Sequence, residues 1–112
     1  MGNLKRTILI DLDGVLNTYK GNFIETFIPP IKNGADEFLK ELSKKYKIKI
    51  FTTRDKLLTS KWISQNCISK YITGITNIKE PAYLYIDDRC IQFRGDYEQL
   101  RQQINNFDVW YN

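Results

Sequence analysis

The chain has 112 residues, of which 42% are hydrophobic and 27% are charged, and its formal net charge is +4. This length and balance predict one soluble globular domain spanning residues 1–112, with a single hydrophobic core. Because the sequence contains no histidine, Ser-His-Asp and Cys-His catalysis, phosphohistidine chemistry and histidine-ligated zinc are excluded.

Other features of the composition indicate where the protein works. No apolar stretch reaches the length that a bilayer span needs, and no signal-peptide pattern opens the chain, so we expect a cytoplasmic protein without a membrane partner. Cys67 and Cys90 form neither a CxxC pair nor a metal spacing and are predicted to be reduced thiols. The mild positive charge suits an anionic substrate but does not by itself indicate nucleic-acid binding.

The first predicted element is a strand over residues 7–10, an apolar run that reads as buried on both faces of a parallel sheet. Asp11 and Asp13 follow it, and ligands of such sheets bind at the carboxyl ends of the strands. Side chains two residues apart on an extended chain point the same way, so both carboxylates are expected to face one pocket. Two close carboxylates favour a divalent cation such as Mg²⁺, whereas the alternative is two solvated acids in a turn.

Residues 15–33 show no clear periodicity, and Pro29-Pro30 closes the segment. We expect a short irregular flap or small hairpin over the strand ends. Irregular segments of this length are often functional. Its aromatic residues have two open roles, packing on the core or stacking against a substrate; they are Tyr19, Phe23 and Phe27.

The rest of the chain alternates between helical and strand patterns. Helices are predicted over residues 34–46, 55–65 and 97–107, and strands over residues 48–51, 72–75, 82–86 and 90–93. Asn33 is predicted to cap the first helix, Asn66 to end the second, and Asp96 to cap the third. This order predicts an α/β fold, a three-layer Rossmann-like parallel sheet of about five strands with helices on both faces.

Polar side chains able to handle a phosphoryl group follow three of the predicted strands. Since the carboxyl ends of parallel strands meet at one edge of a sheet, these side chains are expected to converge. Arg54 is left out of the site, as a solvated residue at a helix start, and Thr53 is kept as an alternative to Thr52. The converging set is Asp11 with Asp13, Thr52, and Asp87 with Asp88, with Lys79 just before the last strand.

The same residues resemble the motifs of the haloacid dehalogenase (HAD) superfamily over nearly the whole chain. Residues 8–15 resemble motif I, an apolar run followed by D-x-D-G-[TV]. Thr52 with Arg54 resembles motif II, Lys79 resembles motif III, and residues 85–88 resemble motif IV in its Asp-Asp form. One departure is visible, because Glu80 separates Lys79 from the proline that many relatives have directly after the lysine.

The resemblance implies a magnesium-dependent phosphatase that hydrolyses a phosphate monoester through an aspartyl-phosphate on Asp11. Asp13 would act as general acid and then general base, and its presence favours phosphoryl chemistry over dehalogenation. Thr52 would donate a hydrogen bond to the phosphoryl group, and Lys79 would balance its charge.

The resemblance also implies a ligand set for the metal. Mg²⁺ would be bound by Asp11, the backbone carbonyl of Asp13, and Asp87. Asp88 would orient a metal-bound water or Lys79.

The resemblance also bears on substrate size. Only 19 residues, Val15 to Asn33, separate the first strand from the first helix, so there is no room for the cap domain that most relatives carry. Capless relatives leave the site open to large substrates, or they oligomerise so that a neighbour covers it. The substrate therefore stays open between a small nucleotide or sugar phosphate and a macromolecular phosphoester, and a homo-oligomer stays open too.

Two alternatives belong to another functional class. The first is a phospho-acceptor such as a response-regulator receiver, in which the acidic pair follows the first strand, the acceptor the third, and lysine comes last. Here an acidic pair follows the fourth predicted strand and no acid ends the third, which argues against a receiver. The second is a non-catalytic, phosphate-binding regulatory module with the same fold, since fold alone does not establish activity.

Overall fold

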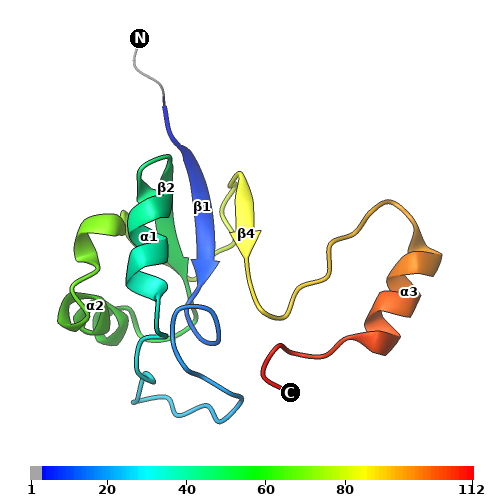
Figure 1. Cartoon of the computed structure of the whole chain (residues 1–112), viewed down its shortest axis with the longest axis horizontal. Coiled ribbons are helices and arrows are strands. Elements are labelled where there is room, and N and C mark those ends of the chain that lie inside the picture. Colours follow the sequence, from blue (N-terminus) through cyan, green and yellow to red (C-terminus); the bar gives the residue numbers. More distant parts are fainter. Residues whose placement is uncertain (1–3) are drawn as a thin grey trace.

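A computed structural model describes residues 4–112, which form an α/β fold around one parallel sheet of four strands (Figure 1). The strand order is β3-β2-β1-β4. The central strand β1 pairs along its whole length with β2 but over only three residues with β4. The strands are β1 (Arg6–Asp11), β2 (Tyr46–Phe51), β3 (Gly74–Thr76) and β4 (Leu84–Ile86).

Two helices, α1 (Ala35–Ser43) and α2 (Lys56–Gln65), cover one face of this sheet. Leu39 of α1 and Trp62 of α2 belong to the same buried cluster as the sheet residue Ile50. The chain steps from β1 to β2 to β3 in one direction across the sheet, and right-handed crossovers then place both helices on one side.

The prediction of helices on both faces is therefore wrong for the part of the chain that the structure describes. The chain returns from β3 to β4 past two strands, but residues 77–83 make this crossing without a helix. The opposite face of the sheet is crossed by this loop, in which Glu80 pairs with Lys49 of β2 at 2.9 Å. The α/β class and the parallel, Rossmann-like sheet are confirmed.

The sheet has four strands rather than about five, because residues 90–93 do not form the expected last strand. A short apolar run becomes a strand only where a neighbouring strand supplies hydrogen-bond partners. In the described residues β4 pairs with β1 alone, so segment 90–93 has no ladder to join.

Helix boundaries follow local capping chemistry with one exception. The Asp55 carboxylate accepts a hydrogen bond from the backbone N–H of Leu58 at 2.9 Å and so caps α2, which ends at Asn66 as predicted. The prediction that Asn33 caps α1 is wrong, because Gly34 holds that position with φ of 90° and no side-chain cap. The helix also ends earlier than predicted, since β2 already begins at Tyr46.

The segment over residues 15–33 is largely irregular and is closed at its base. Asn17 and Ile31 form an isolated antiparallel bridge, and the backbone N–H of Thr18 donates to the carbonyl of Pro30 at 2.9 Å. Phe23 and Phe27 are both more than half exposed. Core packing is thus not the role of these two aromatic rings.

The C-terminal lobe, defined here as residues 87–112, carries the remaining helix, α3 (Tyr97–Asn106). Asp96 caps it as predicted, accepting from the backbone N–H of Glu98 at 3.1 Å. Figure 1 shows α3 standing away from the sheet, beyond β4, while the chain end returns toward the flap. A single 3₁₀ turn, η1 (Ser69–Tyr71), precedes β3. Within residues 4–112, no helix combines the length and apolar character required to cross a membrane.

Candidate functional site

Three carboxylates meet at the carboxyl edge of the sheet. Asp11 is the last residue of β1, and Asp87 and Asp88 directly follow β4, its neighbour. One oxygen from each of the three side chains lies within 4.8 Å of the other two. The parallel pairing of β1 with β4 brings these distant segments together, because both strands end at the same edge.

The environment of this acidic cluster disfavours negative charge. The pKa of Asp11 is raised from its ordinary 3.8 to about 7, first by burial and then by the negative charges of Asp87, Asp88 and Asp13. Burial also raises the pKa of Asp88, as do its hydrogen bond with Asp87 and the charge of that neighbour.

One oxygen of the cluster is buried without any partner. Within residues 4–112, Asp88 Oδ2 is the buried side-chain polar atom that lacks a hydrogen bond. Gly14 faces it closely, with φ of 85°, and a Cβ at position 14 would overlap that oxygen. Hard oxygen donors, uncompensated negative charge and an orphaned buried oxygen together fit a divalent cation such as Mg²⁺. The residues that could hold it are Asp11, Asp87 and Asp88.

The raised pKa of Asp11 predicts that stability in a chelator falls as the pH rises from about 4 to about 7. In this window the folded state keeps the Asp11 proton while the unfolded state releases it, so rising pH favours unfolding. Urea unfolding of the wild type and Asp11→Asn across this range would measure the effect, and the variant should show a flatter profile. An equal slope in both proteins would assign the pH dependence to other groups.

Asp13 does not join the acidic cluster with its carboxylate. Its two oxygens accept hydrogen bonds from Arg54, from Nε at 2.8 Å and from Nη2 at 3.1 Å. Asn17 Nδ2 donates a third at 3.1 Å. The side-chain oxygen of Asn17, Oδ1, in turn accepts from the backbone N–H groups of Gly14 and Tyr19, so this turn holds Asp13 in a fixed orientation.

Arg54 is buried, which corrects the expectation of a solvated residue. Its side chain is 1% exposed, and its Nη1 donates to the flap carbonyl of Ile24 at 2.9 Å and more weakly to that of Glu25 at 3.4 Å. The guanidinium also lies 4.5 Å from the ring centroid of Phe23. Arg54 therefore joins Asp13 to the flap.

Thr52 lies at the end of β2, as the strand pattern places it. It is buried, its backbone N–H donates to the carbonyl of Thr76 at 2.9 Å, and its Oγ1 accepts from the backbone N–H of Arg54 at 3.2 Å. Thr53 is exposed. A cavity of about 490 Å³ adjoins both threonines and continues to Lys56 and β3.

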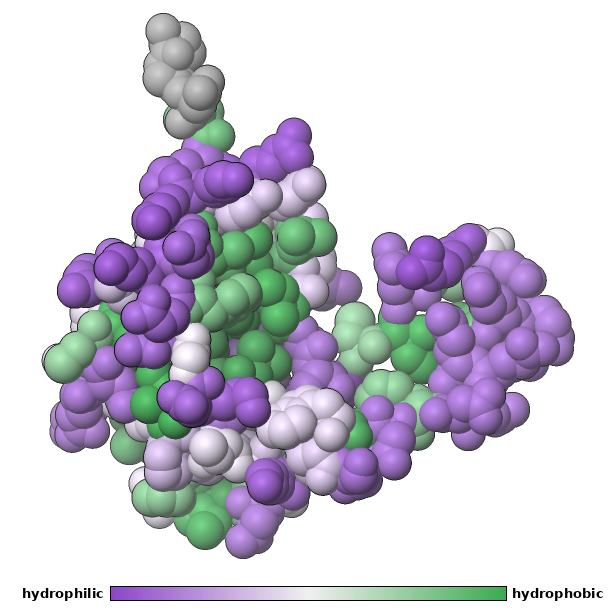
Figure 2. Space-filling view, in the orientation of Figure 1, coloured by the Kyte–Doolittle hydropathy of each residue, from purple (hydrophilic) through white to green (hydrophobic). Residues whose placement is uncertain are grey.

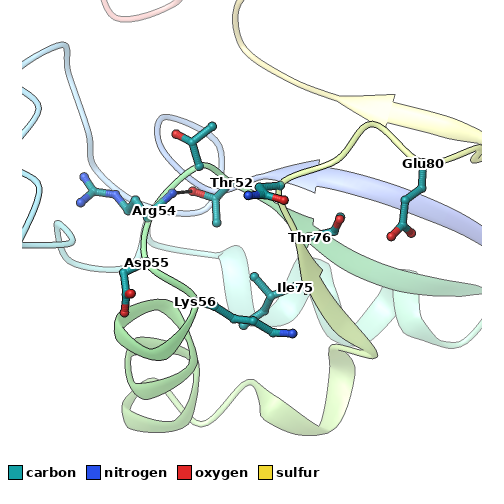
Figure 3. A pocket seen from close by; sticks show the side chains of 9 residues that line it. Thr52, Arg54, Asp55, Lys56, Ile75, Thr76 and Glu80 are labelled. Carbon is teal, nitrogen blue, oxygen red and sulfur yellow. Dashed lines mark hydrogen bonds between the residues drawn. The ribbon is translucent and has the colours of Figure 1, made fainter.

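Figure 3 shows that the two cationic side chains around this cavity, Arg54 and Lys56, point in different directions. The Arg54 guanidinium points away from β3 toward the flap, so it is not offered to the cavity. Lys56 extends along the cavity past Ile75. Lys56 therefore lines the part of the cavity nearer to Ile75 than to Thr52.

Lys79 is not in contact with the acidic cluster. It is exposed, and its ammonium lies 4.9 Å from the ring centroid of Tyr85. It shares a cavity of about 200 Å³ with Asp87, yet no carboxylate in residues 4–112 lies within 4 Å of it. The next residue, Glu80, pairs with Lys49 of β2 and accepts a hydrogen bond from the Tyr85 hydroxyl at its backbone carbonyl.

Sequence reasoning missed Arg54 and Asn17. Each had a usable signal. Asn17 stands four residues after Asp13 in the same turn region. Arg54 closely follows the end of β2, which pairs with the strand that carries Asp11. What could not be seen was the flap closing over Arg54 and removing it from water.

Comparison with known proteins supports the fold. No family model matches the chain, and no curated protein matches its sequence. Among solved structures, the chain is similar to a conserved protein from Bacteroides thetaiotaomicron, with a TM-score of 0.58 and 21% identity over 96% of each chain. At this identity the likeness concerns the fold and not the chemistry.

Proposed function

We propose that this protein is a magnesium-dependent phosphatase that hydrolyses a phosphate monoester through an aspartyl-phosphate on Asp11. The observation that carries the proposal is the cluster of Asp11, Asp87 and Asp88, whose oxygens lie within 4.8 Å of one another at the carboxyl edge of the sheet. Three carboxylates held this close are stabilised by a bound cation, which would also accept the oxygens of a phosphoryl group.

Each residue has a role in the proposed reaction. An Asp11 oxygen attacks the phosphorus, the bond to the leaving oxygen breaks, and Asp13 gives that oxygen a proton, a step in which Asp13 must carry the proton and loosen its pairing with Arg54. Water then attacks the phosphorus, Asp13 takes a proton from it, and inorganic phosphate leaves with Asp11 regenerated. A bound Mg²⁺ would neutralise charge between the carboxylates and the phosphoryl oxygens.

Other side chains serve the substrate. Thr52 Oγ1 carries a hydroxyl hydrogen that can be donated to the phosphoryl group, and the cavity beside it offers room for the leaving group. Lys79 would leave the Tyr85 ring to balance the phosphoryl charge. Substrates from a small nucleotide or sugar phosphate to a macromolecular phosphoester remain compatible with this open edge.

The test is hydrolysis of an aryl phosphate by the purified protein with Mg²⁺ or with a chelator, followed by acid quenching to trap phosphoprotein. We expect turnover with Mg²⁺, loss of turnover in the chelator, and a phosphoryl group recovered on Asp11 by peptide mapping. Metal-independent turnover, or no turnover and no Mg²⁺ binding, would refute the proposal.

A second candidate function has one specific observation in its favour. Asp13 is engaged by the buried guanidinium of Arg54 and by Asn17, which restrains the group that would activate water. A phospho-acceptor or phosphate-binding regulatory module with this site would form the adduct on Asp11 and retain it. The same experiment distinguishes the two, because phosphoprotein would then accumulate in Mg²⁺ without release of phosphate.

A further inference from the structure

The C-terminal lobe carries an apolar stripe that the described chain leaves uncovered. No residue of α3 is buried, and the exposed fractions of Tyr97, Ile104 and Phe107 are 71%, 58% and 42%. Helical spacing places these side chains on one side of α3. Figure 2 shows hydrophobic atoms gathered on the side of the lobe that faces β4, while its outer side is hydrophilic.

A second surface that the described chain leaves partly uncovered is β4, an edge strand of the sheet. Leu84 is 47% exposed. Its neighbours are also at least 40% exposed, but Tyr83 stacks on Tyr46 and Tyr85 donates its hydroxyl to the carbonyl of Glu80. In residues 4–112, β4 has a partner on one side only, so its outer backbone groups are also unpaired. Proteins commonly protect such an edge strand by covering it with a helix or a loop.

The two ends of the lobe hold α3 apart from its own sheet. Near the C-terminus, Trp110 Nε1 donates to the carbonyl of Gly14 at 2.8 Å, and the Lys32 ammonium lies 4.2 Å from the Trp110 ring centroid. At the other end, Arg89 donates to the Tyr111 hydroxyl at 2.8 Å. These contacts hold both ends of the lobe together beside the acidic cluster, while α3 between them stands away from β4.

We propose that the groove between α3 and β4 is filled by the C-terminal lobe of a second copy, in a two-fold symmetric dimer. One chain carries both apolar surfaces and keeps them apart, so reciprocal exchange of lobes covers both surfaces in each copy. A different protein would have to match both surfaces, which a second copy already does. The proposal is independent of the proposed enzymatic function.

Charge distribution favours the same partner. Residues 87–112 contain five acidic and three basic side chains, whereas residues 1–86 contain eight acidic and fourteen basic ones. The lobe of one copy therefore approaches a body of opposite net charge, which steers association and disfavours pairing of body with body.

Sedimentation equilibrium of the full chain over a wide concentration range tests the dimer. We expect a reversible dimer in the wild type and, for Ile104→Asp, a dissociation constant raised about 30-fold or more, because a charge would enter the apolar contact. The matched control is Gln102→Asp, an exposed position on the opposite side of α3, which should dimerise like the wild type. Circular dichroism of both variants checks that the fold is intact.

Hydrogen exchange of α3 provides the second measurement. Protection of its amides that grows with protein concentration, in step with dimer formation, supports the proposal. A monomer at every concentration overturns it, whether α3 is protected by its own sheet or left open for another protein. A dimer that survives Ile104→Asp overturns it as well, because another surface would then form the interface.

Discussion

Asp11→Asn is expected to lower the rate of phosphate-ester hydrolysis by about 10³-fold or more, since an amide is not a competent nucleophile toward phosphorus. The same change removes one of the three oxygens of the acidic cluster and should weaken Mg²⁺ binding. Steady-state kinetics with an aryl phosphate and calorimetric titration with Mg²⁺ would measure the two effects.

The stability of Asp11→Asn separates lost chemistry from lost structure. Because burial and neighbouring charges raise the pKa of Asp11 to about 7, an uncharged amide should leave the metal-free protein at least as stable as the wild type at neutral pH. Asp36→Asn, on the exposed first turn of α1, is the matched control and should retain full activity. Substantial turnover by Asp11→Asn would contradict the covalent mechanism.

Arg54→Met is expected to lower the free energy of unfolding by about 3–5 kcal/mol, the range observed when one partner of a buried ion pair is removed and the other charge stays buried. The Asp13 side chain is only 17% exposed, so its carboxylate would lose its cation while remaining largely shielded from water. The flap carbonyl of Ile24 would lose its donor at the same time. Such a loss is a large share of the roughly 5–15 kcal/mol that stabilises a typical domain.

Urea unfolding of Arg54→Met, beside two controls, would measure this effect. Lys44→Met breaks the exposed pair between Lys44 and Glu41, at 3.7 Å, and should cost at most about 1 kcal/mol. Arg54→Lys keeps the charge but cannot span both Asp13 oxygens and the flap, so its stability should fall between the two. Equal losses in Arg54→Met and Lys44→Met would show that the buried pair contributes no more than a surface one.

Much of the fold could be predicted from the sequence because local signals agreed with tertiary packing. The apolar run before Asp11 became the central strand, and the apolar spacing of Leu39 and Trp62 placed both helices on one core. Asp55 and Asp96 capped their helices through short-range chemistry. The expected strand at residues 90–93 failed because a strand depends on a neighbour, which the segment's own residues do not specify.

The candidate site likewise has a part that the sequence predicts and a part that it does not. The meeting of Asp11 with Asp87 and Asp88 follows from strand ends in a parallel sheet, which the sequence pattern indicates. The burial of Arg54 could not be derived, because it depends on the flap carbonyl of Ile24 arriving from elsewhere in the chain. The contact of Lys79 with Tyr85 and the pairing of Glu80 with Lys49 also have no local sequence signal, because their partners lie on β4 and β2.

The unequal pairing of the central strand has a consequence for the order of folding. β1 forms six residue pairs with β2 but only three with β4, where Ile8 pairs with Leu84. The chain that connects β1 to β2 is also shorter than the chain that connects β1 to β4. Early closure of the shorter loops should therefore assemble β1 to β3 with α1 and α2, and β4 should dock last.

The acidic cluster would then be completed only in that final step, when β4 brings Asp87 and Asp88 beside Asp11. The mutual repulsion of the carboxylates is absent while the first three strands assemble, and it does not oppose their collapse. A cation held by the completed cluster should accordingly slow unfolding without accelerating folding, because its binding site does not exist before the barrier is crossed.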